Sequence, residues 1–432
     1  MSVSLRDARS AELYERARMY LPGGVNSPVR AMRSIGRDPI FVQHAAGAEL
    51  VDVDGNVYVD WVCSWGPLIH GHAHPEIVAA VAEAAQRGTS FGAPTAAEVD
   101  LAEEVSRRVP SVEMLRMTSS GTEATMSAIR LARAVTGRTK LLKFAGAYHG
   151  HVDGLLAQGG SGLATQGIPA SPGVPEEVAA STIVVAWNDA DALVAATERH
   201  ELAAILAEPF PANMGLVPPA DGFLELLRRR ADATGALLVF DEVISGFRVA
   251  PGGAQELCEV DPDLTIMGKV IGGGLPAAAY GGRRELMERI APAGDVYQAG
   301  TLSGNPLAVA AGLATLALLD DEQPYVRLRA TTSALADGLA EAARAAGYDD
   351  VRIATATGLL TVFFSAEPVT DYAAAQACDL DAYGAWCRGL LARGVYAPPS
   401  QFEAWFPSLA HTAEHVDRTV AAATAAFAEI AR

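Results

Sequence analysis

Lysine is nearly absent from this sequence of 432 residues, which contains only Lys140, Lys143 and Lys269. Arginine supplies nearly all of the positive charge. A reaction that needs a primary amine on the protein, such as the attachment of an aldehyde cofactor, therefore has only three candidate residues.

The sequence also lacks a net positive charge, long apolar runs and cysteines at a recognisable motif spacing. The formal net charge of −18 argues against a nucleic-acid groove, because phosphate backbones require clustered Lys and Arg. No apolar run reaches the length of a membrane span, and residues 1–6 show no signal-peptide pattern. We therefore expect a cytoplasmic protein that binds neither membranes nor nucleic acid. Four cysteines match no zinc or redox spacing, so neither a disulfide framework nor a metal site is expected: Cys63, Cys258, Cys378 and Cys387.

The order of apolar and helical patterns predicts three segments. Residues 1–60 form an N-terminal helix and hairpin arm, with the helix over 6–20 and the hairpin over 49–60. Residues 61–315 form a large α/β domain with a mostly parallel central sheet and helices on both faces, and residues 316–432 form a smaller α+β domain. Candidate strands of the central sheet are 114–118, 140–144, 182–186, 203–207, 236–240 and 264–267.

Residues 150–181 are rich in Gly and Pro and show no helix or strand periodicity. Long ordered loops of this kind are usually lids or binding loops, so we expect a lid over the active site. In the smaller domain, we expect helices over 330–345, 380–393 and 414–430 and a strand over 359–364.

Three features stand at the carboxyl ends of predicted strands, where open parallel sheets bind their ligands. Ser120-Gly121-Thr122 begins a helix and offers backbone N–H groups to an anion, although an ordinary helix cap fits as well. Asp241-Glu242 follows an apolar strand, where a helix cap is again an alternative. Lys269 lies among glycines in an apolar stretch, which does not suit a solvated surface charge.

Together these features match the needs of pyridoxal phosphate. That cofactor requires a phosphate cradle, a carboxylate beside its pyridine nitrogen and a lysine for its aldehyde. Tyr148 follows the strand over 140–144 and is a candidate for stacking on the cofactor ring, with core packing as the alternative. Metal binding by His70, His72 and His74 is a rival hypothesis, but Pro75 indicates that a helix begins directly after them.

The chain resembles the glutamate-1-semialdehyde 2,1-aminomutase family, a branch of the class III aminotransferases with the fold-type I architecture of pyridoxal-phosphate enzymes. The resemblance spans nearly the whole chain. It rests on the segments 22–30, 120–124, 148–151, 213–215, 240–243, 268–274, 300–306 and 400–404.

The resemblance implies a role for each matched residue. Lys269 is the catalytic lysine that binds the cofactor aldehyde, Asp241 pairs with the pyridine nitrogen, and Tyr148 stacks on the ring. Further cofactor-binding residues are Ser120, Gly121, Thr122, His149, Asn213, Val243 and, from the partner subunit of a homodimer, Thr301. The substrate-binding residues are Ser27, Arg30, Ser161 and Glu403.

The implied reaction converts glutamate 1-semialdehyde to 5-aminolevulinate for porphyrin biosynthesis, with the cofactor alternating between pyridoxal and pyridoxamine phosphate. The resemblance also suggests a transient contact with glutamyl-tRNA reductase, the upstream enzyme. Ser119, Ala145, Ala147 and Phe210 depart from the family pattern near the pocket rim. The alternative is a class III transaminase that uses a separate amine donor and acts on another amino ketone or an ω-amino acid.

Overall fold

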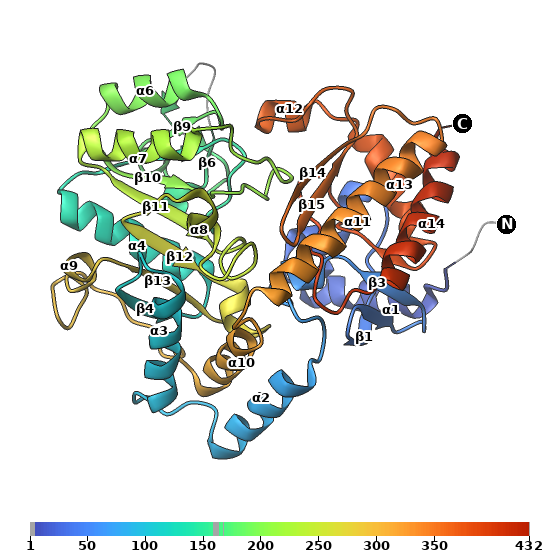
Figure 1. Cartoon of the computed structure of the whole chain (residues 1–432), viewed down its shortest axis with the longest axis horizontal. Helices are drawn as coiled ribbons and strands as arrows, with labels where there is room; N and C mark the ends of the chain where they lie inside the picture. The colour runs from blue at the N-terminus through green and yellow to red at the C-terminus, as the bar shows by residue number, and fades with distance from the viewer. Residues whose placement is uncertain (1–4, 159–163, 167, 432) are drawn as a thin grey trace.

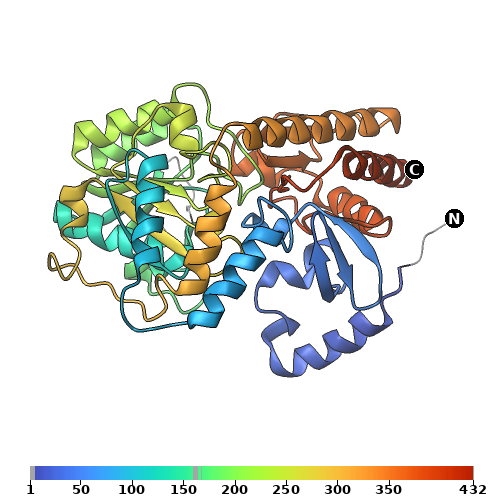
Figure 2. The ribbon, with the colours of Figure 1, turned by 60° about the horizontal axis from the view of Figure 1, so that its bottom comes forward.

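A computed structural model describes residues 5–158, 164–166 and 168–431 of the chain. Two lobes are visible in Figure 1. The larger lobe is built around an eight-stranded sheet, and the smaller lobe combines the two ends of the chain, with α1 and α14 both in it. Figure 2 shows α2 (Pro75–Arg87) and α10 (Pro306–Ala317) side by side where the lobes meet.

The large sheet has the strand order β4-β13-β12-β11-β10-β5-β9-β7. Its five central strands, from β12 to β9, are parallel, β13 runs antiparallel to both of its neighbours, and β7 is antiparallel to β9. The strands are β4 (Met114–Thr118), β5 (Lys140–Phe144), β7 (Ala164–Gln166), β9 (Thr182–Val185), β10 (Leu202–Ala207), β11 (Leu237–Glu242), β12 (Leu264–Met267) and β13 (Ala278–Gly282).

Helices cover both faces of this sheet. Successive side chains of a strand point to opposite faces, and the side chains on both faces are apolar here, so both faces must be covered. In β5, Leu141 packs on the side of α4 (Gly121–Thr136), whereas Phe144 packs on the opposite side against Trp187 and Phe223. Figure 1 shows α6 (Ala190–Arg199) and α7 (Phe223–Thr234) on that opposite face. The expected α/β architecture with helices on both faces is confirmed.

The smaller lobe joins segments from the two ends of the sequence. Its four-stranded sheet has the order β1-β2-β3-β16, and β16 (Val395–Tyr396) lies parallel to β3 (Val57–Asp60). The other two strands are β1 (Val42–Ala46) and β2 (Glu49–Asp52). The N-terminal hairpin and the C-terminal segment therefore share one sheet, although sequence analysis treated them as separate.

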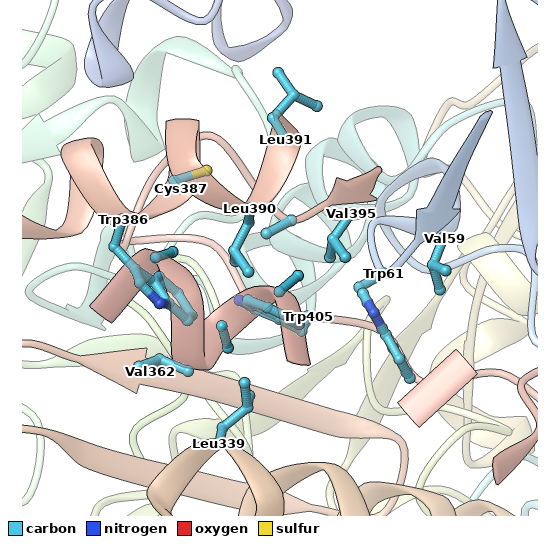
Figure 3. Packing of buried hydrophobic residues seen from close by; sticks show 14 of the residues in the cluster. Val59, Trp61, Leu339, Val362, Trp386, Cys387, Leu390, Leu391, Val395 and Trp405 are labelled. Atoms are coloured by element: carbon cyan, nitrogen blue, oxygen red, sulfur yellow. The ribbon is translucent and has the colours of Figure 1, made fainter. Parts of the chain in front are cut away.

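A cluster of buried aromatic residues holds these two ends together (Figure 3). Trp61, Trp386 and Trp405 are fully buried in it, with Leu339 of α11 (Gln323–Ala345) and Val362 of β15 (Leu359–Phe363). Such cores supply most of the folding free energy through burial of apolar area.

The remaining elements complete the two lobes. The helices are α1 (Ala8–Tyr20), α3 (Ala96–Arg108), α5 (Glu176–Ala179), α8 (Ala254–Cys258), α9 (Arg284–Met287), α12 (Tyr372–Gln376), α13 (Leu380–Leu391) and α14 (Ala413–Ile430). The remaining strands are β14 (Arg352–Ala356), which pairs with β15, and the short pair β6 (Ala157–Gln158) and β8 (Ile168–Pro169). None of the helices in the described ranges is long and apolar enough to cross a membrane.

The sequence-based strands of the central sheet are confirmed, with end shifts of one or two residues. Residues 150–181 contain short regular elements, although their sequence shows no helix or strand periodicity. β7 lies within this segment and extends the large sheet by pairing with β9, and the short helix α5 follows it. Short edge strands give little periodic signal, because three residues do not establish an alternation.

Two buried histidines make the fold sensitive to acid. Burial lowers the pKa of His70 to about 4 and that of His411 to about 3, from an ordinary value of 6.5. The unfolded chain therefore binds protons first, so the stabilisation from these residues is complete above pH 6.5 and declines as the pH falls below it. By pH 5 we expect a loss of about 2 kcal/mol per histidine.

Urea unfolding of the protein at pH 7.5 and pH 5.0 measures this loss. Replacement of His411 by Gln removes one of these titrating groups, so the difference between the two pH values should shrink by about 2 kcal/mol. An undiminished difference in the His411→Gln protein would assign the acid sensitivity to other groups.

Candidate active site

The ends of several parallel strands surround a cavity of about 220 Å³ in the larger lobe. This is the edge of the sheet at which ligands are expected. A neighbouring cavity of about 700 Å³ shares Tyr148 with it. Among the residues that the structure describes, twelve line the smaller cavity: Gly121, Thr122, Thr125, Tyr148, His149, Gly150, Glu208, Asn213, Asp241, Val243, Ile244 and Lys269. Eight of them are site residues expected from the sequence.

Lys269 follows β12 directly and begins a short 3₁₀ helix, Lys269–Gly272. Its backbone φ is 47°, a left-handed conformation that costs about 1–2 kcal/mol for a residue with a side chain and is typical of functional sites. Burial lowers the pKa of its amine, and the nearby carboxylates Asp241 and Glu208 partly oppose this. A lysine with a lowered pKa is more often neutral, and the neutral amine is the nucleophile.

Asp241 lies near the end of β11, with its carboxylate 5% exposed. Its Oδ2 atom is 2.8 Å from His149 Nδ1, and its Oδ1 accepts a hydrogen bond of 3.1 Å from the backbone N–H of Val243. Burial lowers the pKa of His149, which favours a neutral ring whose Nδ1–H donates to Asp241. His149 Nε2 is buried without a partner in the described part of the chain. This carboxylate is oriented from two sides and faces the cavity.

The first turn of α4 forms another wall of the cavity. Ser120 is the N-cap of this helix, and its side chain accepts a hydrogen bond from Glu123 N. The N–H groups at the start of a helix have no partner within it and attract anions. At Gly150 (φ 80°) a Cβ would lie 2.6 Å from Thr122 Oγ1, so only glycine lets the turn after Tyr148 approach this helix end.

Glu208 is a site residue that sequence analysis missed. It follows β10 directly, is 4% exposed and accepts hydrogen bonds from Tyr148 N at 3.0 Å and from Asn213 Nδ2 at 2.9 Å. Burial, with a smaller contribution from Asp241, raises the pKa of its carboxyl to about 8. An acidic residue directly after an apolar strand was the available signal, the same signal that pointed to Asp241.

Several expected site residues lie outside the cavity lining. Ser27 and Arg30 lie at the short 3₁₀ helix Pro28–Ala31 of the smaller lobe, and Thr301 borders a separate hollow beside residues 90–95. Glu403 is near enough for its charge to act on Lys269 and Tyr148, and burial raises its pKa to about 7. Ser161 lies outside the described residues.

Two of the three histidines of the rival metal hypothesis contact other groups. His70 Nε2 lies 3.0 Å from Thr315 O, and His72 Nε2 lies 2.6 Å from Asp60 Oδ2. Within the ranges that the structure describes, no three His, Cys, Asp or Glu side chains are grouped so that they could hold a metal ion.

The chain belongs to the class-III aminotransferase family, whose sequence model matches residues 32–425. Among individual proteins, it is 56% identical over 421 residues, 97% of each chain, to the glutamate-1-semialdehyde 2,1-aminomutase of Desulforudis audaxviator.

Two solved structures share the fold over nearly the full length. An omega-transaminase from Sphaerobacter thermophilus superposes with a TM-score of 0.89 at 35% identity, covering 98% of this chain and 97% of that one. A glutamate-1-semialdehyde-aminomutase variant from Pseudomonas aeruginosa PAO1, in complex with PMP, gives a TM-score of 0.88 at 28% identity, covering 98% and 94%.

Proposed function

We propose that the chain catalyses the glutamate-1-semialdehyde 2,1-aminomutase reaction, which converts glutamate 1-semialdehyde to 5-aminolevulinate by moving an amino group within one carbon skeleton. The observation that carries the proposal is the 56% identity over 97% of the chain to a protein of that name. This identity is well above the 35% shared with the omega-transaminase. The product serves porphyrin biosynthesis.

The cavity suits pyridoxal or pyridoxamine phosphate. It brings together an amine (Lys269), a buried carboxylate (Asp241) and the anion-attracting start of α4. When bound, the cofactor supplies an electron sink through its protonated ring nitrogen. In the proposal, Asp241 holds the proton on that nitrogen and His149 orients Asp241 through its Nδ1–H.

The other residues bind and cover the cofactor. Gly121 and Thr122, beside the N-cap Ser120, would hold the phosphate with N–H groups of the helix start. Tyr148 would cover the ring, Asn213 would face its hydroxyl group, and Val243 would pack against it. Lys269 would bind the aldehyde carbon and, once free, move a proton between carbon atoms as a general base and acid.

Substrate binding involves residues around this cavity. Ser27 and Arg30 are proposed to bind the substrate carboxylate, because a guanidinium matches a carboxylate with two parallel hydrogen bonds. Glu403 would exclude a second substrate carboxylate by its charge. The segment 150–181, with Ser161, is proposed to close over the site and keep water and the intermediate amine in place.

The proposed assembly is a cytoplasmic homodimer in which Thr301 of the partner subunit helps to bind the phosphate. Exposed apolar side chains near Thr301 support this assembly: Phe91 is 52%, Tyr297 73% and Leu302 53% exposed. A transient contact with glutamyl-tRNA reductase would limit the escape of the reactive aldehyde substrate.

A class III transaminase with a separate amine donor is the second candidate. The observation in its favour is the omega-transaminase, which has the same fold and 35% identity to this chain. That enzyme class needs two different substrates for each cycle.

The two candidates differ in their need for an amine donor. We expect the purified protein, loaded with cofactor, to form 5-aminolevulinate from glutamate 1-semialdehyde at the same initial rate with and without added alanine or another amine. A rate that depends on the donor would favour the transaminase.

A further inference from the structure

We propose that Lys143 and Glu208 act together as positioning residues that fix one peptide group, Ala147–Tyr148, at the wall of the cofactor cavity. This inference rests on the proposed function, since it assigns a task to two buried charges beside the same site. We call the arrangement the peptide clamp.

Lys143 forms one side of the peptide clamp. It is 5% exposed, and its Nζ donates hydrogen bonds to Ala147 O at 2.9 Å and to Leu155 O at 3.1 Å. No carboxylate lies within ion-pair distance of it in the part of the chain that the structure describes. Burial lowers its pKa to about 8, and the charge of Glu208 opposes that shift. A buried ammonium group needs such compensation, because the loss of its hydration is strongly unfavourable.

Glu208 forms the other side. Its Oε1 accepts the Tyr148 N–H at 3.0 Å, and its Oε2 accepts from Ala212 N at 3.3 Å and from Asn213 Nδ2 at 2.9 Å. One carboxylate therefore sets the backbone at Tyr148 and the amide orientation of Asn213. Tyr148 and Asn213 both line the cavity.

The two charges meet at a single peptide group. The carbonyl oxygen of Ala147 and the N–H of Tyr148 belong to the same planar amide, whose dipole lies between its O and H atoms. The Lys143 ammonium at the oxygen and the Glu208 carboxyl at the N–H both stabilise that dipole and fix the rotation of the plane. Burial opposes the charge on Glu208, but its two oxygens accept three N–H groups, which favour the ionised form. This plane directly precedes Tyr148 and is one residue from His149, so its rotation affects the placement of both side chains.

A paired arrangement has a distinctive energetic consequence. Removal of one charge leaves the other buried without compensation, whereas removal of both eliminates the mismatch. The double variant Lys143→Met/Glu208→Gln should therefore be less impaired than the sum of its single variants.

The test measures the dissociation constant of pyridoxal phosphate from the apo-protein and the visible circular dichroism of the bound cofactor, which reports the orientation of its ring. We expect Lys143→Met and Glu208→Gln each to weaken cofactor binding about tenfold or more, as for other buried hydrogen bonds to charged groups. The double variant should bind no more weakly than the weaker single variant, and both single variants should show altered dichroism.

Glu242→Gln is the matched control. Glu242 is also a buried glutamate at a strand end that accepts backbone N–H groups, from Ala254 and Gln255, but it does not line the cavity. Its replacement should lower thermal stability and leave cofactor affinity and dichroism unchanged. Glu208→Gln nearly conserves volume, so it carries the test alone if Lys143→Met does not fold.

The possible outcomes separate the two proposals. Failure of the unchanged protein to bind pyridoxal phosphate would overturn the proposed function and the clamp with it. Normal binding by the unchanged protein together with unaltered affinity in Glu208→Gln would overturn the clamp alone. Strictly additive losses in the double variant would also overturn the clamp. Additive losses would mean that the two residues act independently, whereas two residues that fix the same peptide group should be coupled.

Discussion

The Lys269→Ala protein is expected to lack the visible absorbance band of lysine-bound pyridoxal phosphate and to lose at least about 10²–10⁴-fold in turnover, the usual contribution of a positioned proton-transfer group. Lys269 lines the cavity beside Asp241 and is the only one of the three lysines that does so. Its removal eliminates both the attachment point and the proposed proton carrier. Absorbance spectra and a 5-aminolevulinate assay measure the two effects.

Lys140→Ala is the matched control for this prediction. Lys140 is the first residue of β5 and so lies at the end of the strand away from the cavity. Its Nζ is 3.2 Å from His200 Nδ1. Its replacement should leave absorbance and turnover unchanged. Chemical reduction of the loaded protein followed by peptide mapping should place the cofactor on Lys269, and a label on Lys143 would contradict the assignment.

The second large effect is expected for Asp241→Asn, which should lower turnover by about 10²–10³-fold, as the loss of one preorganised electrostatic partner does in other enzymes. Asparagine has nearly the same shape but carries no charge to keep a proton on the ring nitrogen. The buried carboxylate and its 2.8 Å contact to His149 are the observations behind this expectation.

Glu242→Gln again provides the control, because this neighbouring carboxylate bonds Ser245 and the backbone of 254–255 instead of facing the cavity. Comparison of the two variants at equal cofactor saturation isolates the charge at the ring from general destabilisation. A loss of less than about threefold in Asp241→Asn would remove Asp241 from its proposed role.

The sequence predicted the central sheet well because its strands are apolar and separated by clear helix signals. The same strands end in chemically distinctive residues, so the sequence alone predicts that Asp241 and Lys269 lie together, as the cavity lining confirms. A lysine between an apolar strand and a glycine run has few structural explanations, which made Lys269 the strongest single indication.

Other features depend on contacts between residues that are distant in sequence. The pairing of Val395 with Val59 joins the two ends of the chain, and no local pattern records such a partner. The peptide clamp is similar, because Lys143 and Glu208 are 65 positions apart (208 minus 143) and meet only at the Ala147–Tyr148 peptide group. Ser27 and Arg30 come from the smaller lobe, so their approach to substrate depends on how the lobes and the partner subunit assemble.

The most direct test of the proposed function is the stoichiometry of the reaction with glutamate 1-semialdehyde as the sole substrate. We expect the loaded protein, free of other amines, to form many equivalents of 5-aminolevulinate per subunit with no net release of ammonia. Nuclear magnetic resonance can follow the formation of the product. Product formation that stops at or below one equivalent per subunit, and resumes only when an amine donor is added, would contradict the internal transfer of the amino group.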